Sequence, residues 1–128
     1  MRGNIVRNEE RFVMRYNSVL DLHTHTVASG HAYCSLREMA KAASEKGLEV
    51  LGITEHAPSM PGTCHKFYFN NLKVVPREMY GIQLLLGSEV NILDAQGTVD
   101  LGQHTLSSMD VVIASLHTPC MKPASKLE

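Results

Sequence analysis

Four short apolar runs along the chain each end in a side chain that can bind a metal ion. They are Val19–His25, Val50–His56, Leu84–Glu89 and Val111–His117. Runs of this length and composition predict buried parallel strands. The C-terminal ends of parallel strands in an α/β barrel converge on one rim, where barrel enzymes carry their chemistry. We therefore expect the imidazoles and the carboxylate to meet at one side of the fold.

A helix is predicted between the first two runs. Ser35-Leu36-Arg37-Glu38 has the spacing of a capping box, which places the start of the helix at Leu36. Apolar residues follow at the i, i+3, i+4, i+7 positions, and Gly47 after Lys46 supplies a stop. With strands near 19–22 and 48–54, the helix 36–46 completes a βαβ unit.

The rest of the chain predicts further elements of the same kind. Residues 57–71 predict a long loop, because Pro58, Pro61 and Gly62 interrupt any regular pattern. Its His65–Phe69 segment either lines a substrate pocket or packs as an aromatic lid. We expect a short helix at 76–80, a strand at 83–87, a turn at Asp94–Gly97 and a helix at 101–109.

The length of the chain limits how much of a barrel it can form. The chain has 128 residues and 44% hydrophobic residues, enough for one domain with a core. A closed barrel of eight strand–helix units needs about 250 residues, so four such units supply about half of one.

Charge and cysteine content restrict the partners and the compartment. Twelve basic and thirteen acidic residues give a net charge of -1, without the basic surface of a nucleic-acid-binding protein. The three cysteines are far apart and form no C-x-x-C pair, which favours a reduced, cytoplasmic setting. No apolar run reaches the roughly 20 residues that cross a bilayer. Residues 1–17 are read as a polar N-terminal extension.

The first strand offers two candidate ligands. His23 and His25 are two residues apart, so on an extended strand they share a face and can bind one ion together. A lone H-x-H pair is weak evidence for a metal site, and the candidate ligands on the other strands strengthen it. Asp21 is in phase with both, and we expect it to orient an imidazole rather than to bind metal.

The second and third strands add an imidazole and a carboxylate. Neighbouring strand residues point to opposite faces, so only one of Glu55 and His56 can face the rim. We choose His56 and expect Glu55 to form a salt bridge on the outer face. Glu89 follows an apolar run in which a carboxylate is costly to bury unless a cation compensates it. A glutamate can also bridge two ions, so Glu89 suits a centre with several metals.

Three other histidines differ in context. His117 ends a strand as apolar as the third, and its alternative interpretation is a satisfied core histidine. His31 lies in the first loop, near enough in sequence to fold over the rim. His104 falls in the predicted helix 101–109 and is assigned no ligand role. Neither H-E-x-x-H nor its inverse occurs, which disfavours zincin-type protease chemistry.

Taken together, these residues resemble the polymerase and histidinol phosphatase (PHP) superfamily, in particular its small bacterial phosphatases. The resemblance rests on Asp21–His25, His31, Thr54–His56, Glu89 and His117, and runs from about Ser18 to Pro119. It implies an α/β fold in which residues 18–128 are the N-terminal portion of a distorted (β/α)7 TIM-like barrel, incomplete in this chain.

The resemblance also implies a centre of up to three ions, usually zinc, with manganese or iron as alternatives. By position, His23, His25 and Glu89 would serve one ion, Glu89 and His117 a second, and His31 and His56 a third. Glu89 and His117 are the expected catalytic residues. Members of the superfamily carry a further histidine and an Asp-x-His pair that would fall after Glu128, so we expect a truncated chain with incomplete sites.

The leading hypothesis is a metal-dependent phosphoesterase that hydrolyses a small phosphate ester through a metal-activated water. We expect the intact protein to be active and this chain alone to be inactive, with no nucleic acid or membrane as partner. One alternative is a PHP-type nuclease, which the near-neutral charge disfavours. Another is a catalytically silent metal-binding or interaction module that self-associates through an open barrel edge.

Overall fold

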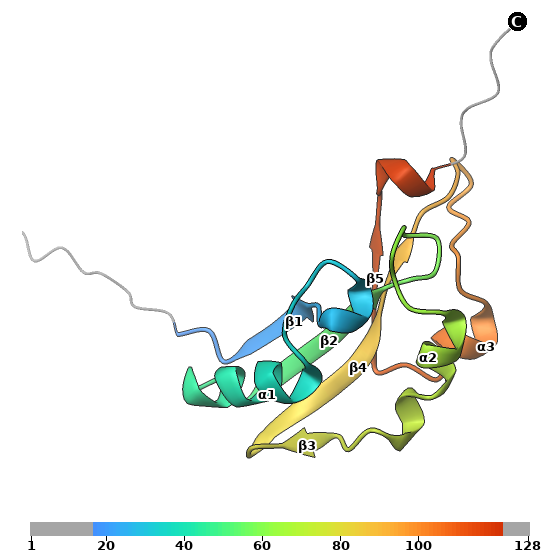
Figure 1. Ribbon diagram of the computed structural model, residues 1–128. Coiled ribbons are helices and arrows are strands. Elements are labelled where there is room, and N and C mark those ends of the chain that lie inside the picture. The colour runs from blue at the N-terminus through green and yellow to red at the C-terminus, as the bar shows by residue number, and fades with distance from the viewer. Residues whose placement is uncertain (1–16, 122–128) are drawn as a thin grey trace, which may run out of the picture.

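Five strands form one sheet in the computed structural model, which describes residues 17–121 (Figure 1). The four longer strands are β1 (Leu20–Thr24), β2 (Val50–His56), β4 (Ile82–Asn91) and β5 (Val111–Ser115). They pair in parallel as β1–β2, β2–β4 and β4–β5. The curled parallel sheet confirms the predicted α/β class and corresponds to part of a β/α barrel.

Helix α1 (Leu36–Glu45) connects β1 and β2 as the sequence predicts. The Ser35 hydroxyl accepts from the backbone N–H of Glu38, and the Glu38 carboxylate accepts from the N–H of Ser35, which completes the capping box. Ala40 and Ala43 are buried in the core. Gly47 ends the helix region with a φ of 81°, a left-handed conformation that favours glycine.

Strand β4 is longer than predicted. The sequence indicates residues 83–87, whereas the strand spans Ile82–Asn91. Its second half contains Ser88, Glu89 and Asn91, yet all three are buried. Pairing with β2 on one side and β5 on the other continues the backbone ladder through these polar residues, so Glu89 lies within the strand rather than after its end.

The short helix predicted at 76–80 is wrong. Residues Glu78–Met79 form strand β3, which pairs antiparallel with the start of β4. Tyr80 and Gly81 connect the two strands with φ values of 53° and 77°, and two consecutive positive φ angles are typical of a type I′ hairpin turn. The backbone therefore reverses where a helix would have continued.

Other connections differ in length from their predicted elements. The predicted loop 57–71 contains helix α2 (Lys66–Asn70), and the predicted helix 101–109 is reduced to α3 (Gln103–Leu106). The turn at Asp94–Gly97 is confirmed by a hydrogen bond from the Gly97 N–H to the Asp94 carbonyl (3.1 Å). Three short 3₁₀ turns complete the connections: η1 (Val27–Ser29), η2 (Leu72–Val74) and η3 (Thr118–Cys120).

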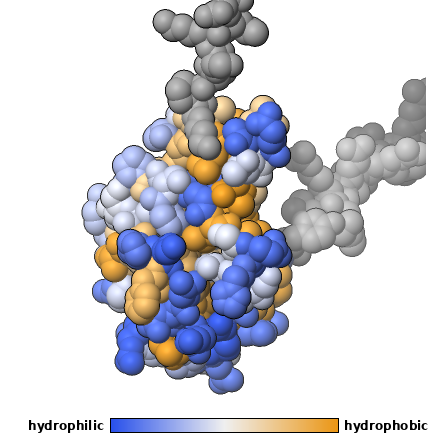
Figure 2. All heavy atoms as spheres, turned by 90° about the vertical axis from the view of Figure 1, so that its right-hand side faces the viewer, coloured by the Kyte–Doolittle hydropathy of each residue, from blue (hydrophilic) through white to orange (hydrophobic). Residues whose placement is uncertain are grey.

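The core lies between the sheet and its covering helices. Leu51, Ile53, Leu84 and Leu86 contribute from the central strands, and Phe69 contributes from α2. Figure 2 shows hydrophobic and hydrophilic side chains interspersed on the face that looks to the right in Figure 1. Among residues 17–121, no helix is long and apolar enough to cross a membrane. The expected polar extension, 1–17, lies outside the described residues except for Asn17.

Candidate metal centre

The carboxylate of Glu89 lies among four imidazoles. Its Oε2 atom is 3.2 Å from His23 Nε2, 3.2 Å from His25 Nε2 and 2.9 Å from His56 Nδ1, and its Oε1 atom is 3.3 Å from His117 Nε2. These ligand candidates come from β1 and the residue that follows it, from β2 and β4, and from the segment after β5. The parallel arrangement therefore gathers residues that are up to 94 positions apart in the sequence.

His31 joins the same cluster from the first loop. Its Nε2 atom lies 3.0 Å from His56 Nε2, and the two rings are 4.7 Å apart between centroids. The preceding Gly30 has a φ of 83°, and a Cβ atom there would lie 2.0 Å from the carbonyl oxygen of Gly62. Glycine thus allows the loop to pack closely enough to bring His31 over the rim. All six predicted ligands are in one cluster.

The distances within the cluster suit cation ligands. Two ligands bound to a tetrahedral zinc ion at roughly 2.0–2.1 Å lie about 3.3 Å apart, close to most of the separations around Glu89. His56 Nδ1 and Glu89 Oε2 are buried without a hydrogen-bond partner of acceptable geometry. A buried polar atom left unpaired is costly, and a cation would satisfy both.

Two three-residue groups have ligand atoms close enough to hold one ion each. One consists of His23, His25 and Glu89, and the other of His56, Glu89 and His117. Glu89 is common to both. His56 also faces His31 through its other nitrogen, so the third predicted pair is near enough to act together.

Burial keeps the inner imidazoles neutral. Desolvation lowers the pKa of His56 from 6.5 to about 4, and it also lowers the pKa of His25. Burial alone would raise the pKa of Glu89, but the nearby Ser115 hydroxyl and His23 imidazole outweigh this, and the pKa lies below its usual value. Neutral imidazoles and an ionised carboxylate are the protonation states that metal binding requires.

A β-bulge alters the expected role of Asp21. Asp21 pairs with Leu51 and Thr24 pairs with Ile53, so β1 advances three residues while β2 advances two. The bulge removes Asp21 from the phase of His23 and turns it toward a cavity of 220 Å³ beneath α1. The Asp21 carboxylate accepts from the backbone N–H of His23 (3.1 Å), so it does not orient an imidazole as expected.

Glu55 also differs from the expectation. The sequence suggests a salt bridge on the outer face, whereas Glu55 is completely buried. Its carboxylate accepts from the Thr26 N–H and from the hydroxyls of Thr26 and Ser29. Opposite orientation of neighbouring strand residues is nevertheless retained, because His56 points into the histidine cluster while Glu55 points away from it.

Sequence reasoning missed a network behind His117. The Nδ1 atom of His117 lies 2.7 Å from Asn91 Oδ1, and the Asn91 amide group donates to the Ala57 carbonyl and to Asp100 Oδ2. With the amide group thus committed, Oδ1 must accept, so His117 carries its proton on Nδ1 and presents Nε2 to Glu89. Position 91 alone gives no signal, since the contact partners are distant in sequence.

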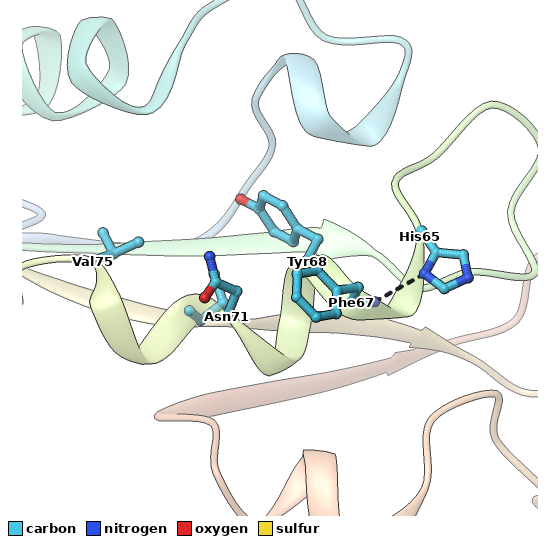
Figure 3. Close-up of a pocket in the computed structure, with 6 residues that line it drawn as sticks. His65, Phe67, Tyr68, Asn71 and Val75 are labelled. Atoms are coloured by element: carbon cyan, nitrogen blue, oxygen red, sulfur yellow. Dashed lines mark hydrogen bonds between the residues drawn. The ribbon is translucent and has the colours of Figure 1, made fainter.

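The His65–Phe69 segment forms a separate site. Phe69 packs into the core, His65 accepts from the N–H of Phe67 at the start of α2, and Phe67 remains largely exposed. Figure 3 shows His65, Phe67 and Tyr68 around a pocket of 340 Å³ at α2. Its lining contains none of the six candidate ligands. Of the two interpretations of this segment, packing applies to Phe69 and pocket lining to Phe67 and Tyr68.

Comparison with known proteins adds independent information. The sequence matches the PHP domain family over residues 21–127. It is 56% identical over 112 residues to a probable phosphatase of Clostridium novyi, which covers 88% of this chain and 45% of the relative. It is 49% identical over 110 residues to a probable phosphatase of Thermoanaerobacter sp., with 86% and 45% covered.

A third relative extends the same pattern. A probable phosphatase of Caldanaerobacter subterraneus subsp. tengcongensis is 48% identical over 115 residues, which cover 90% of this chain and 45% of the relative. The chain thus spans somewhat less than half the length of these curated relatives.

Proposed function

The chain belongs to the PHP domain family, and we propose that it supplies one side of the metal centre of a phosphoesterase. The observation that carries the proposal is the buried carboxylate of Glu89, which faces four imidazoles and whose Oε2 atom has no hydrogen-bond partner of acceptable geometry. Neutral imidazoles around an anionic carboxylate fit zinc, and the same donors accept manganese and iron.

We propose that the six candidate ligands divide among three ions. His23, His25 and Glu89 would hold one, Glu89 and His117 a second, and His31 and His56 a third. Bound cations polarise phosphoryl oxygens and lower the pKa of a bound water, which is the chemistry that phosphate ester hydrolysis needs. Glu89 would act at two ions because its Oε2 faces His23 and His25 and its Oε1 faces His117.

We further propose a small phosphate ester as the substrate and Glu89 and His117 as the catalytic residues. The relatives named above are probable phosphatases. The chain has balanced charge, with 12 basic and 13 acidic residues, and so carries no net positive charge that would favour binding to a nucleic acid backbone. Neutralisation of the phosphate would therefore depend on the metal centre.

The test is hydrolysis of an aryl phosphate by the protein expressed from its complete reading frame. After loading with zinc or manganese, it should release phenolate, and Glu89→Gln should lose this activity. His104→Ala is the matched control, because His104 lies in α3 outside the cluster. Absence of turnover with every metal tested, or full activity of Glu89→Gln, would contradict the proposal.

A further inference from the structure

A second buried carboxylate lies behind the candidate ligands. Glu55 is completely buried, and its carboxylate accepts hydrogen bonds from N–H and O–H groups of one short segment, Thr26–Ser29. The Thr26 N–H lies 3.1 Å from both carboxylate oxygens, and the hydroxyls of Thr26 and Ser29 each donate to one oxygen. These hydrogen bonds fix the turn that separates His25 from His31.

The single hydroxyl proton of Ser29 determines which ring nitrogen of His25 carries a proton. A serine hydroxyl has one proton to donate and can accept two hydrogen bonds. Ser29 directs its proton to Glu55 and accepts from the backbone N–H of His56 at 3.0 Å. The remaining contact joins Ser29 Oγ to His25 Nδ1 at 3.0 Å, and Ser29 can only accept there. His25 must therefore carry its proton on Nδ1.

We propose that Glu55 and Ser29 are positioning residues that hold His25 in the Nδ1–H form and keep its Nε2 lone pair directed at Glu89. This deepens the function proposed above and rests on it, because the lone pair matters only if a cation binds there. The Nε2 atom lies 3.2 Å from Glu89 Oε2, on the side of the ring opposite Ser29. A histidine that binds metal through one nitrogen commonly donates its other N–H to such a partner.

The same contacts set the position of two further ligands. Thr26 and Ser29 bound the turn η1, and Glu55 binds both, so the turn is held as a unit between His25 and His31. The N–H of His56 donates to the Ser29 hydroxyl, which ties β2 to the same point. Loss of Ser29 should therefore loosen the alignment of ligands on two elements.

The tautomer of His25 gives a readout that does not depend on catalysis. In the metal-free chain labelled with 15N-histidine, two-bond 1H–15N correlation spectra at neutral pH distinguish Nδ1–H from Nε2–H, and a His25→Gln variant assigns the signal. We expect Nδ1–H in the wild type. Ser29→Ala should release the ring from this single form and weaken zinc binding, measured against a chromophoric chelator, by roughly ten- to a hundred-fold.

Two further variants separate positioning from stability. Glu55→Gln keeps the side-chain volume but introduces an amide that can donate to Ser29, so the Nδ1–H population and the zinc affinity should both fall. Ser88→Ala is the matched control: Ser88 is equally buried, and its hydroxyl donates to the backbone carbonyl of Glu55 rather than to the carboxylate. It should leave the His25 tautomer unchanged.

The outcomes distinguish this proposal from the proposed function. A wild-type His25 in the Nε2–H form, or Ser29→Ala and Glu55→Gln proteins with unchanged tautomer and zinc affinity, would overturn the positioning role. A wild-type chain that binds no zinc but holds His25 as Nδ1–H would contradict the metal centre while leaving the Ser29 contact established.

Discussion

Replacing Glu89 by glutamine should damage the whole centre, whereas replacing a single histidine should damage part of it. Both three-residue groups contain Glu89, so the substitution leaves each with two imidazoles. His117→Ala removes a ligand from only one group. Because Glu89 is buried at 3% exposure and glutamine has the same size, the comparison isolates the charge and the ligand oxygen.

The magnitude follows from ligand number. Loss of a partner that only orients a ligand commonly costs ten- to a hundred-fold in metal affinity, and loss of a direct ligand should cost at least the upper value. A hundred-fold loss corresponds to about 2.7 kcal/mol at each group. Equilibrium dialysis with metal analysis, and competition with a zinc chelator, should therefore detect weaker binding at both groups in Glu89→Gln and at one group in His117→Ala.

The control and the refuting result follow from the same geometry. His104→Ala should bind zinc as the wild type does. If Glu89→Gln retained wild-type affinity and stoichiometry, Glu89 could not be the shared ligand. If His117→Ala lost all zinc, the two groups could not bind their ions separately.

Three further predictions concern stability. Burial lowers the pKa of His56 to about 4, so between pH 6.5 and pH 4 the unfolded chain takes up a proton that the folded chain resists. The urea concentration at the unfolding midpoint of the metal-free chain should therefore decrease as the pH is lowered from 6.5 toward 4. His56→Gln should flatten this pH dependence, and an unchanged pH dependence in the variant would contradict the prediction. A Cβ atom at Gly87 would lie 1.7 Å from the carbonyl oxygen of Val111. Gly87→Ala should therefore lower the free energy of unfolding by about 1–3 kcal/mol, measured by urea denaturation. A variant with the wild-type unfolding midpoint would refute this close contact. Ser35→Ala removes the side-chain cap on the Glu38 N–H and should lower the free energy of unfolding by about 1 kcal/mol. Urea denaturation followed by circular dichroism measures this, and an unchanged stability would show that the cap is dispensable.

Local signals predicted the elements that local chemistry determines. Helix α1 was predictable because the Ser35 and Glu38 capping pair and the buried alanines lie within the helix itself. The turn ending at Gly97 was predictable for the same reason. By contrast, the hairpin at Tyr80 and Gly81 was missed, because tyrosine gives no signal for a positive φ and the partner strand decides the pairing.

Within the site, the sequence predicted which residues lie close together, but it did not predict the hydrogen bonds that position them. His23, His25, His56 and His117 lie at or just after the ends of apolar runs, so the direction of parallel strands was sufficient to bring them together with Glu89. His31 reaches the same cluster from a loop instead. The bulge at β1, which turns Asp21 away, depends on pairing with β2 and has no mark in the sequence. The contacts of Glu55 with Ser29 and of Asn91 with Asp100 link residues whose association only the folded chain reveals.

Glu89 is shared among imidazoles from separate strands, and this makes cation binding a thermodynamic reporter of folding. In the unfolded chain only His23 and His25 remain near each other, so a cation would bind the native sheet in preference to the denatured ensemble. A free zinc concentration one hundred times the dissociation constant would then stabilise the fold by about 2.7 kcal/mol. The population of folded molecules would thus depend on the metal supply of the surroundings, and a chelator would act as a mild denaturant.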